Sequence, residues 1–290
     1  MAQKNSNLYE VSFICEGAAP GQTDILRGIL ASQGVKPHDI VETQLASEQR
    51  LCVYFTVSDK ARSFMAKVKK VPLRNIRISS KVIKSRDWQT VWKEEFRPFV
   101  LTKRFEIVPY QYRKSHRSGD YEPVYIDTIC AFGTGLHATT RFMSGFIEGC
   151  SGKFDSFLDI GTGTGLLAII ALKCGATDVT AIDLRRDIID IANMNFRENG
   201  YSQQKARAIN FQKYHSKKKF DFVAANLVTV DLLTFRHQLI NLVGQGKYLA
   251  VSGISLSHYA EFRQAFDRLP LRCLKIKKGE GWSALLFQKE

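Results

Sequence analysis

The spacing of apolar and polar positions differs between the first and the later part of the chain. Over the first eighty or so residues, alternating segments typical of strands enclose two stretches with helical spacing. The expected elements are strand, helix, strand, strand, helix and strand at residues 8–15, 22–33, 40–46, 51–57, 59–71 and 75–83. This order is that of the split βαββαβ unit of ferredoxin-like α+β domains. A fold of this kind does not by itself specify a function.

A short aromatic-rich segment follows this first part. Trp88, Trp92 and Phe96 recur at the spacing of one helix face before Pro98 ends the pattern. Residues 87–99 are therefore expected to form a linker helix whose aromatic stripe packs on one of the domains. Ligand contact by these aromatic side chains is the alternative interpretation. The polar stretch at residues 111–122 is expected to be an exposed loop.

From residue 154 onward, short apolar strands alternate with helices. Strands are expected at residues 156–160, 178–183, 220–226, 248–252, 271–277 and 283–288, with helices at 165–174, 187–199, 230–242 and 260–266. This alternation is typical of a parallel, doubly wound sheet. The chain is thus predicted to be an α/β protein with a Rossmann-like doubly wound domain. Its expected parts are a ferredoxin-like domain at 1–84, a linker helix and connection at 85–110, and the doubly wound domain at 111–290.

The clearest chemical motif is FLDIGTGTG at residues 157–165, an apolar strand carrying an acid that runs into three glycines. Glycine lets the backbone approach a ligand more closely than any Cβ would allow, and the helix that follows presents free amide groups. In open α/β sheets, ligands bind at the carboxyl ends of strands near the switch point. We therefore expect Gly161, Gly163 and Gly165 to bind a cofactor.

Residues next to these glycines indicate which class of nucleotide cofactor the loop binds. A dinucleotide-binding fingerprint needs Gly or Ala where this chain has Leu166, and the Gly-Lys-Ser/Thr ending of a Walker loop is absent. Asp159 places negative charge two residues before the first glycine. That charge favours the sulfonium and ammonium groups of S-adenosylmethionine over the phosphates of NAD. A structural role for Asp159, in which it caps the amides of the loop, is the alternative.

Two further strand ends complete the predicted site. Asp183 closes the strand at 178–183, where an acid can accept both ribose hydroxyls of a nucleoside, and helix capping is its alternative role. Asn226 closes the strand at 220–226, the strand end that faces the sulfonium methyl in methyltransferases of this architecture. Its amide oxygen could orient an attacking amine. Because no Pro-Pro-aromatic pattern follows Asn226, a flexible aliphatic amine such as lysine is favoured over the planar amines of bases or glutamine.

The charge balance points to an anionic partner without identifying it. The chain carries 42 Lys and Arg against 28 Asp and Glu, a formal net charge of +14. Basic residues gather between Lys60 and Arg86 and again between Lys205 and Lys219. Such groups favour RNA or an RNA-rich particle, and a solvated basic surface is the alternative.

Other features of the composition exclude several classes of protein. No apolar run is long enough for a transmembrane helix, and the N-terminus has no signal or transit pattern, so no membrane contact and a cytoplasmic location are expected. Six scattered cysteines without a CxxC pair indicate reduced thiols. In the segment AFGTGLHATT, His137 has no second ligand at a suitable spacing, so no metal is expected. Thr139 and Thr140 there are expected to cap the following helix.

Together these motifs resemble a known family. AFGTGLHATT, DIGTGTG, AID, AANLV and VSGI, which begin at residues 131, 159, 181, 224 and 251, look like the ribosomal protein methyltransferases of the PrmA family. The resemblance covers nearly the whole chain. It implies a class I S-adenosylmethionine-dependent enzyme that methylates lysine side chains and the N-terminal amine of the large-subunit protein L11, and an N-terminal ferredoxin-like domain that recognises the substrate. On the matching positions, Thr140, Gly161, Asp183 and Asn226 would contact the cofactor.

The sequence thus predicts a methyltransferase that acts on amines of a ribosomal protein. Three alternatives stay open. An RNA methyltransferase is favoured by the charge and disfavoured by the missing Pro-Pro-aromatic pattern. A second alternative is a methyltransferase of another protein lysine, such as one in an electron-transfer flavoprotein. The third is a non-catalytic module that binds a ribosomal particle and retains a nucleoside pocket.

Overall fold

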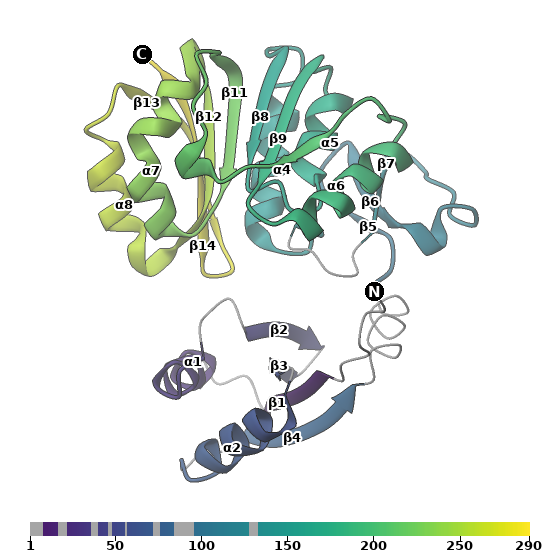
Figure 1. The fold of residues 1–290 in the computed structure, drawn as a ribbon, viewed down its shortest axis with the longest axis vertical. Coiled ribbons are helices and arrows are strands. Elements are labelled where there is room, and N and C mark those ends of the chain that lie inside the picture. Colours follow the sequence, from purple (N-terminus) through teal and green to yellow (C-terminus); the bar gives the residue numbers. More distant parts are fainter. Residues whose placement is uncertain are drawn as a thin grey trace. The chain divides into compact units, whose positions relative to one another are not determined.

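The protein divides into two compact units in its three-dimensional structure, a computed structural model. The structure describes residues 8–16, 22–35, 40–45, 48–55, 57–71, 76–83, 96–127 and 133–290. The units are Met1–Glu95 and Phe96–Glu290, both drawn in Figure 1. The expected linker helix at 87–99 lies mostly outside the described residues, and its described end is not helical, since Phe99 begins a strand. Phe96 is buried and packs edge-on against Phe99, so this aromatic has the packing role expected of it.

The first unit is a four-stranded antiparallel sheet with two helices. Its elements are β1 (Leu8–Glu16), α1 (Gln22–Ser32), β2 (Ile40–Leu45), β3 (Glu48–Phe55), α2 (Ser58–Val68) and β4 (Ile76–Ile83). The strands lie in the order β2-β3-β1-β4. Alternate residues of β1 and β3, such as Val11, Phe13 and Val53, pack against Leu26 of α1 and Phe64 of α2. The expected ferredoxin-like arrangement is therefore present.

The second unit is built around a seven-stranded sheet of order β10-β9-β8-β11-β12-β14-β13. In chain order these strands are β8 (Ser156–Ile160), β9 (Asp178–Asp183), β10 (Ala206–Ala208), β11 (Phe220–Asn226), β12 (Val243–Ser255), β13 (Leu271–Gly279) and β14 (Trp282–Lys289). The doubly wound fold is confirmed. The expected parallel pairing is found from β10 to β12, whereas β14 runs antiparallel to both neighbours. The reason is the two-residue connection from β13 to β14, because so short a turn can join only antiparallel strands.

Helices cover both faces of this sheet (Figure 1). On one face α4 (Ala138–Gly149), α5 (Leu166–Lys173) and α6 (Arg186–Glu198) share a core with Phe157 and Phe222. On the other face α7 (Thr229–Leu242) and α8 (Tyr259–Phe266) pack with Leu158 and Val223. Successive residues of β8 and β11 thus serve opposite cores, as the period of two in a strand requires.

A small three-stranded sheet that the sequence did not predict covers α5 from outside. It consists of β5 (Phe99–Val100), β6 (Phe105–Pro109) and β7 (Glu122–Ile126), and every residue of β6 is buried. Its side chains join the same core as α5, which is apolar on all sides because it is enclosed between two sheets. The loop expected at 111–122 is largely exposed, but its last residue, Glu122, already belongs to β7.

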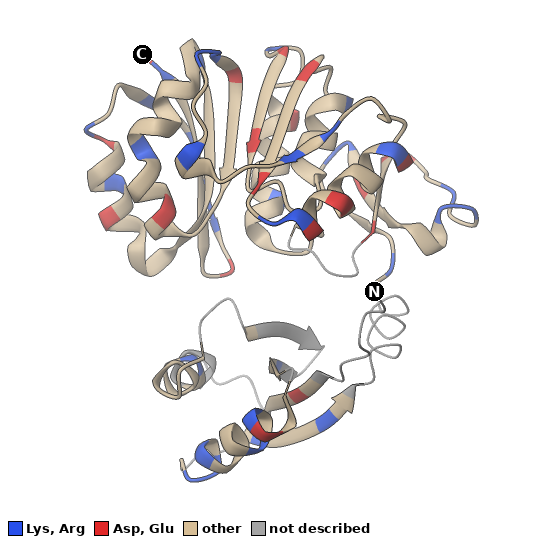
Figure 2. Cartoon of the chain, viewed as in Figure 1, with Lys and Arg blue, Asp and Glu red and all other residues tan. Residues whose placement is uncertain are grey.

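Basic residues are distributed over both units (Figure 2). In the first unit, Lys69 and Lys70 are exposed at the end of α2. In the second unit, Lys218 forms an ion pair with Asp178 and Lys219 donates to a backbone carbonyl. Part of the second basic group is therefore engaged within the protein. No helix among the described residues is long and apolar enough to cross a membrane.

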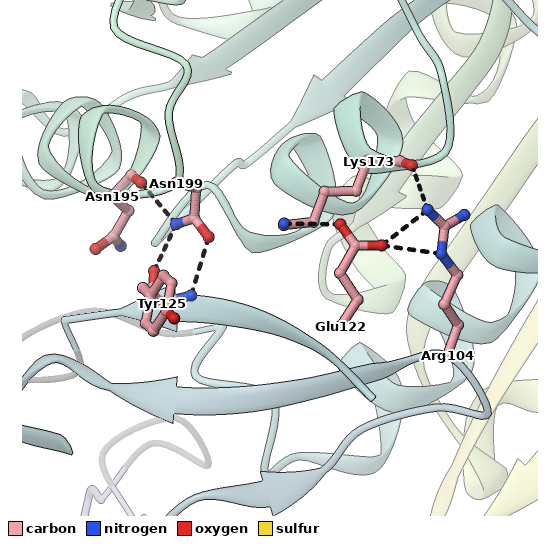
Figure 3. A network of polar contacts seen from close by, with 6 residues as sticks. All are labelled: Arg104, Glu122, Tyr125, Lys173, Asn195 and Asn199. Carbon is pink, nitrogen blue, oxygen red and sulfur yellow. Dashed lines mark hydrogen bonds and ion pairs between the residues drawn. The ribbon is translucent and has the colours of Figure 1, made fainter. Parts of the chain in front are cut away.

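Polar contacts at both ends of β7 hold the small sheet on the helices (Figure 3). At its start, Glu122 accepts hydrogen bonds from Arg104 at 2.8 Å and from Lys173 at 2.9 Å. Near its end, the Asn199 side chain pairs with Tyr125 as a neighbouring strand would. Its Oδ1 accepts from the Tyr125 amide at 2.9 Å, and its Nδ2 donates to the Tyr125 carbonyl at 2.7 Å.

We expect Asn199→Ala to lower the free energy of unfolding by about 1–3 kcal/mol, because two main-chain groups of Tyr125 would lose their partners. Asn193→Ala is the matched control on the same helix, since Asn193 accepts one hydrogen bond, from the Ala206 amide. Urea denaturation would measure both variants. An equal or smaller loss for Asn199→Ala would show that this contact does not hold β7 in place.

Candidate functional site

The site residues expected from the sequence meet at one edge of the seven-stranded sheet. The glycine loop follows β8, Asp183 ends β9 and Asn226 ends β11. Both β9 and β11 pair with β8 in parallel, so all three carboxyl ends lie together. From β8 the chain order of the strands proceeds outward in both directions, which makes this edge the topological switch point of the sheet.

The glycine loop has a backbone shape that favours glycine. Gly161, Gly163 and Gly165 have φ angles of 71°, 55° and 80°. A Cβ on Gly161 would also lie 2.8 Å from the side chain of Leu227, and one on Gly165 would lie 3.3 Å from the Phe196 ring. Close approach to this chain's own side chains is thus a second reason for glycine at these two positions. Ligand contact by the loop remains a prediction.

Asp183 ties the loops after β8 and β9 together. One carboxylate oxygen accepts from the Gly163 amide and the other from the Arg185 amide, each at 3.1 Å. The N-cap residue of α6 is Arg185, so the helix-cap role is not observed for Asp183. Each carboxylate oxygen has a further lone pair, which leaves acceptor capacity for ribose hydroxyls.

Asp159 is turned into the protein beneath the loop. Its side chain is 1% exposed and accepts a hydrogen bond from the Thr162 hydroxyl at 2.7 Å. Burial raises the pKa of Asp159 to about 7, while the Thr162 hydroxyl acts in the opposite direction. The carboxyl is therefore partly protonated at neutral pH. This geometry supports the structural role considered for Asp159, and cofactor contact by it remains a prediction.

Asn226 is linked to the start of α4. Its Nδ2 donates to the Thr139 hydroxyl at 3.2 Å, and that hydroxyl lies 2.7 Å from Nδ1 of His137. The His137 ring in turn packs against Trp282, with ring centroids 5.1 Å apart. This chain of contacts places the Asn226 amide at the edge of the sheet, beside the glycine loop.

The expectation that Thr139 and Thr140 cap α4 is wrong. His137 is the N-cap residue, and no side chain caps the helix. Both threonines lie inside the first turn and are buried, so their side chains are directed to the protein interior. The Thr140 hydroxyl has no hydrogen-bond partner among the described residues. A buried hydroxyl of this kind is a feature that a bound ligand would satisfy.

Thr164 and Asn195, which were not predicted as site residues from the sequence, stabilise the glycine loop through hydrogen bonds. The Thr164 hydroxyl donates to the Gly133 carbonyl at 2.7 Å, and Nδ2 of Asn195 donates to the Thr164 carbonyl at 2.7 Å. Oδ1 of Asn195 accepts from the Asp127 amide at 2.9 Å. Asn195 is fully buried in a helix face that is otherwise apolar. That interruption is the signal by which the sequence could have revealed it.

Metal ligands and cysteines add nothing to this site. Within the described parts of the chain, no group of three or more His, Cys, Asp and Glu could hold a metal ion. The cysteines at 52, 150, 174 and 273 are free thiols, and Cys130 lies outside the described residues.

Comparisons with known proteins extend over both units. The family model described as ribosomal protein L11 methyltransferase (PrmA) matches residues 11–290. The ribosomal protein L11 methyltransferases of two Staphylococcus aureus strains, bovine RF122 / ET3-1 and JH1, are each 29% identical over 249 residues, 83% of this chain and 79% of the relative. A crystal structure of ribosomal protein L11 methylase from Lactobacillus delbrueckii subsp. bulgaricus aligns with a TM-score of 0.62 and 26% identity. It covers 67% of this chain and 100% of that one.

The raised pKa of Asp159 predicts how its replacement changes stability with pH. The ordinary pKa is 3.8, and in the folded protein it is about 7. Between these values the unfolded chain is ionised while the folded chain keeps its proton, so stability falls as the pH rises. Asn cannot titrate. We therefore expect Asp159→Asn to raise the melting temperature by about 5 °C at pH 8 and by much less at pH 4.

Asp221→Asn is a control of opposite sign. Burial raises the pKa of Asp221, but Lys247 and the amides of Asp155 and Ser156 outweigh burial and lower the pKa to about 2. Ionised Asp221 therefore stabilises the folded protein above pH 4, and this contribution is lost as the pH falls toward 2. The variant should melt below the parent at pH 8. Melting curves of Asp159→Asn that shift equally at both pH values would contradict the raised pKa.

Proposed function

The chain belongs to the ribosomal protein L11 methyltransferase (PrmA) family, and from this premise we propose that it methylates the counterpart of ribosomal protein L11 on lysine side chains and on the N-terminal amine. It is an S-adenosylmethionine-dependent methyltransferase, as its motifs predicted. The single observation that carries the proposal for the site is the position of Asn226, beside the glycine loop and fixed through Thr139. We also propose a cytoplasmic location, which the sequence predicted.

The residues at the switch point fit S-adenosylmethionine. The turn at Gly161, Gly163 and Gly165 leaves backbone amides at the start of α5, and Asp183 retains acceptor capacity for a ribose. The buried Thr140 hydroxyl is available to a bound ligand. When bound, S-adenosylmethionine supplies an electrophilic methyl group on a positively charged sulfur.

Asn226 orients the acceptor amine in this proposal. Because its Nδ2 is engaged by Thr139, its Oδ1 is the atom left to accept a hydrogen bond from the amine. A lysine amine has a reference pKa near 10.4, so it must lose a proton before it can attack. Transfer from water into the protein surface disfavours the charged form and lowers that pKa. Solvent water takes the proton, and no side chain is assigned as a general base.

We propose RNA contact as a secondary property, located in the first unit. The cations at the end of α2, including Lys69 and Lys70, are exposed. Lys218 and Lys219 of the second basic group already have partners within the protein. The first group is therefore the better candidate for phosphate contact.

Methyl transfer from radiolabelled S-adenosylmethionine to ribosomal particles, with and without RNase, tests the proposed function. A labelled small ribosomal protein of the size of L11 is the expected result. Label that RNase removes would instead identify an RNA methyltransferase, and label in a non-ribosomal protein would identify another lysine acceptor. Binding of S-adenosylhomocysteine without any transfer would indicate a non-catalytic module.

We expect Asn226→Ala to lower kcat for L11 methylation about 100-fold, because the amine would no longer be held in line with the methyl group. The Kd for S-adenosylhomocysteine, measured by calorimetry, should change far less. Thr234→Ala is a control, since Thr234 lies on the adjacent helix α7 and its hydroxyl bonds only the local Val230 carbonyl in the described structure. An unchanged kcat in Asn226→Ala would remove Asn226 from the mechanism.

A further inference from the structure

The surface next to Asn226 carries exposed apolar side chains. Val228 and Val230, which follow β11, are 54% and 68% exposed, and Leu256, which follows β12, is 44% exposed. We call these three residues the β11–β12 rim. An exposed valine or leucine alone needs no explanation, but apolar side chains gathered at one place mark a contact surface.

Main-chain contacts hold the two loops of the rim side by side. The Leu227 amide donates to the Ser252 carbonyl at 3.1 Å, and the Thr229 hydroxyl lies 3.4 Å from the Gly253 carbonyl. The approach is so close that a Cβ on Gly253 would lie 2.0 Å from the Leu227 carbonyl oxygen. Val228 and Val230, on either side of Thr229, are thus fixed next to the loop that carries Leu256.

The rim is also continuous with the wall of the site. The Leu256 amide donates to the Gly281 carbonyl at 2.9 Å, in the hairpin between β13 and β14. Trp282, the next residue, packs against His137, which reaches Asn226 through Thr139. The rim is therefore connected to Asn226 by a continuous series of contacts.

The charge of these loops differs from that of the chain as a whole. Residues 220–235 and 248–262 contain no Lys or Arg, although the chain has 42 in its 290 residues. Both segments contain acids. Asp231 follows Val230 in the first turn of α7, and Glu261 is exposed in α8. The two segments are thus apolar with acidic residues of their own, on a protein whose net charge is +14. One cation that contacts them is Lys278 of β13, whose Nζ lies 3.5 Å from the centroid of the Tyr259 ring.

We propose that the β11–β12 rim binds a basic polypeptide segment, the segment that carries the acceptor amine. This inference rests on the proposed function and adds to it the surface that the acceptor contacts. Val228, Val230 and Leu256 bury against the apolar part of the segment, while Asp231 attracts its cations. A nucleic acid would need cations for its phosphates, and these loops offer none.

Substitutions of opposite charge at Val230 test the proposal. With purified L11 as the acceptor, Val230→Lys should raise the acceptor KM about tenfold, and Val230→Glu should leave it unchanged or lower it. The Kd for S-adenosylhomocysteine should stay the same in both variants. Because Val230 is exposed, neither change should unfold the protein, and Leu256→Lys gives a second position with the same expected rise. Equal effects of Val230→Lys and Val230→Glu would overturn the proposed charge complementarity.

Ile276→Lys is the matched control. Ile276 is an exposed apolar residue of the edge strand β13, with 46% of its surface accessible. Its replacement should leave the acceptor KM unchanged. A rise equal to that of Val230→Lys would mean that added charge anywhere weakens acceptor binding, which would overturn the assignment of the rim.

Amide exchange and methylation assays test whether L11 binds the rim. Amide exchange at residues 227–231 and 254–258 should slow when L11 is added. If these amides exchange at the same rate with and without L11, L11 does not cover the rim and the proposal is wrong. Failure of the unaltered enzyme to methylate L11 would contradict the proposed function itself. Normal methylation together with an unchanged KM in Val230→Lys would contradict only the rim.

Discussion

The sharp turn between β8 and α5 is the constraint on which the site depends. Three left-handed glycines allow the chain to leave the sheet and enter a helix within five residues, from Gly161 to Gly165. The turn is not held by its own residues alone. Asp183 binds the Gly163 amide from the neighbouring strand, and Asn195 binds the Thr164 carbonyl from α6. The glycine loop is therefore shaped by contacts from two other elements, and its amides keep their direction because those contacts fix the backbone.

The small sheet takes part in that support. Asn195 binds the Asp127 amide just after β7 as well as the glycine loop, and Asn199, one turn later at the C-cap of α6, pairs with Tyr125. The side chains at the end of α6 therefore connect two parts of the unit. One is the small sheet of β5, β6 and β7, which the sequence did not predict, and the other is the glycine loop, which it did predict. Thr164 extends the connection to Gly133, which precedes α4 and the threonines beside Asn226. The two sides of the site are consequently coupled through buried and partly buried hydrogen bonds, and such bonds are costly to leave unmade.

Much of this arrangement could be predicted from the sequence, for a definite reason. Strand ends follow from local sequence patterns, so the sequence predicts that the glycine loop, Asp183 and Asn226 lie at one edge of the sheet. Contacts between distant segments leave no local pattern. The bond from Asn226 to Thr139 joins residues 87 apart in the chain, and the polar support from Asn195 reaches Thr164, 31 residues away. The threonines of α4 are of a type that suits an N-cap, but they lie two and three residues after the N-cap His137 and are therefore inside the helix.

Net charge and local charge have to be considered separately in this protein. A net charge of +14 acts over distance, where salt screens it within about 10 Å. The proposed acceptor surface, in contrast, is formed by the loops after β11 and β12, which carry no Lys or Arg. A positively charged enzyme can therefore act on a positively charged polypeptide if the cations lie elsewhere, for example at the end of α2. Exposed cations there could contact RNA while the apolar loops beside Asn226 contact protein. The same separation explains why composition alone favoured a nucleic-acid partner, whereas the residues around Asn226 favour an amine on a protein.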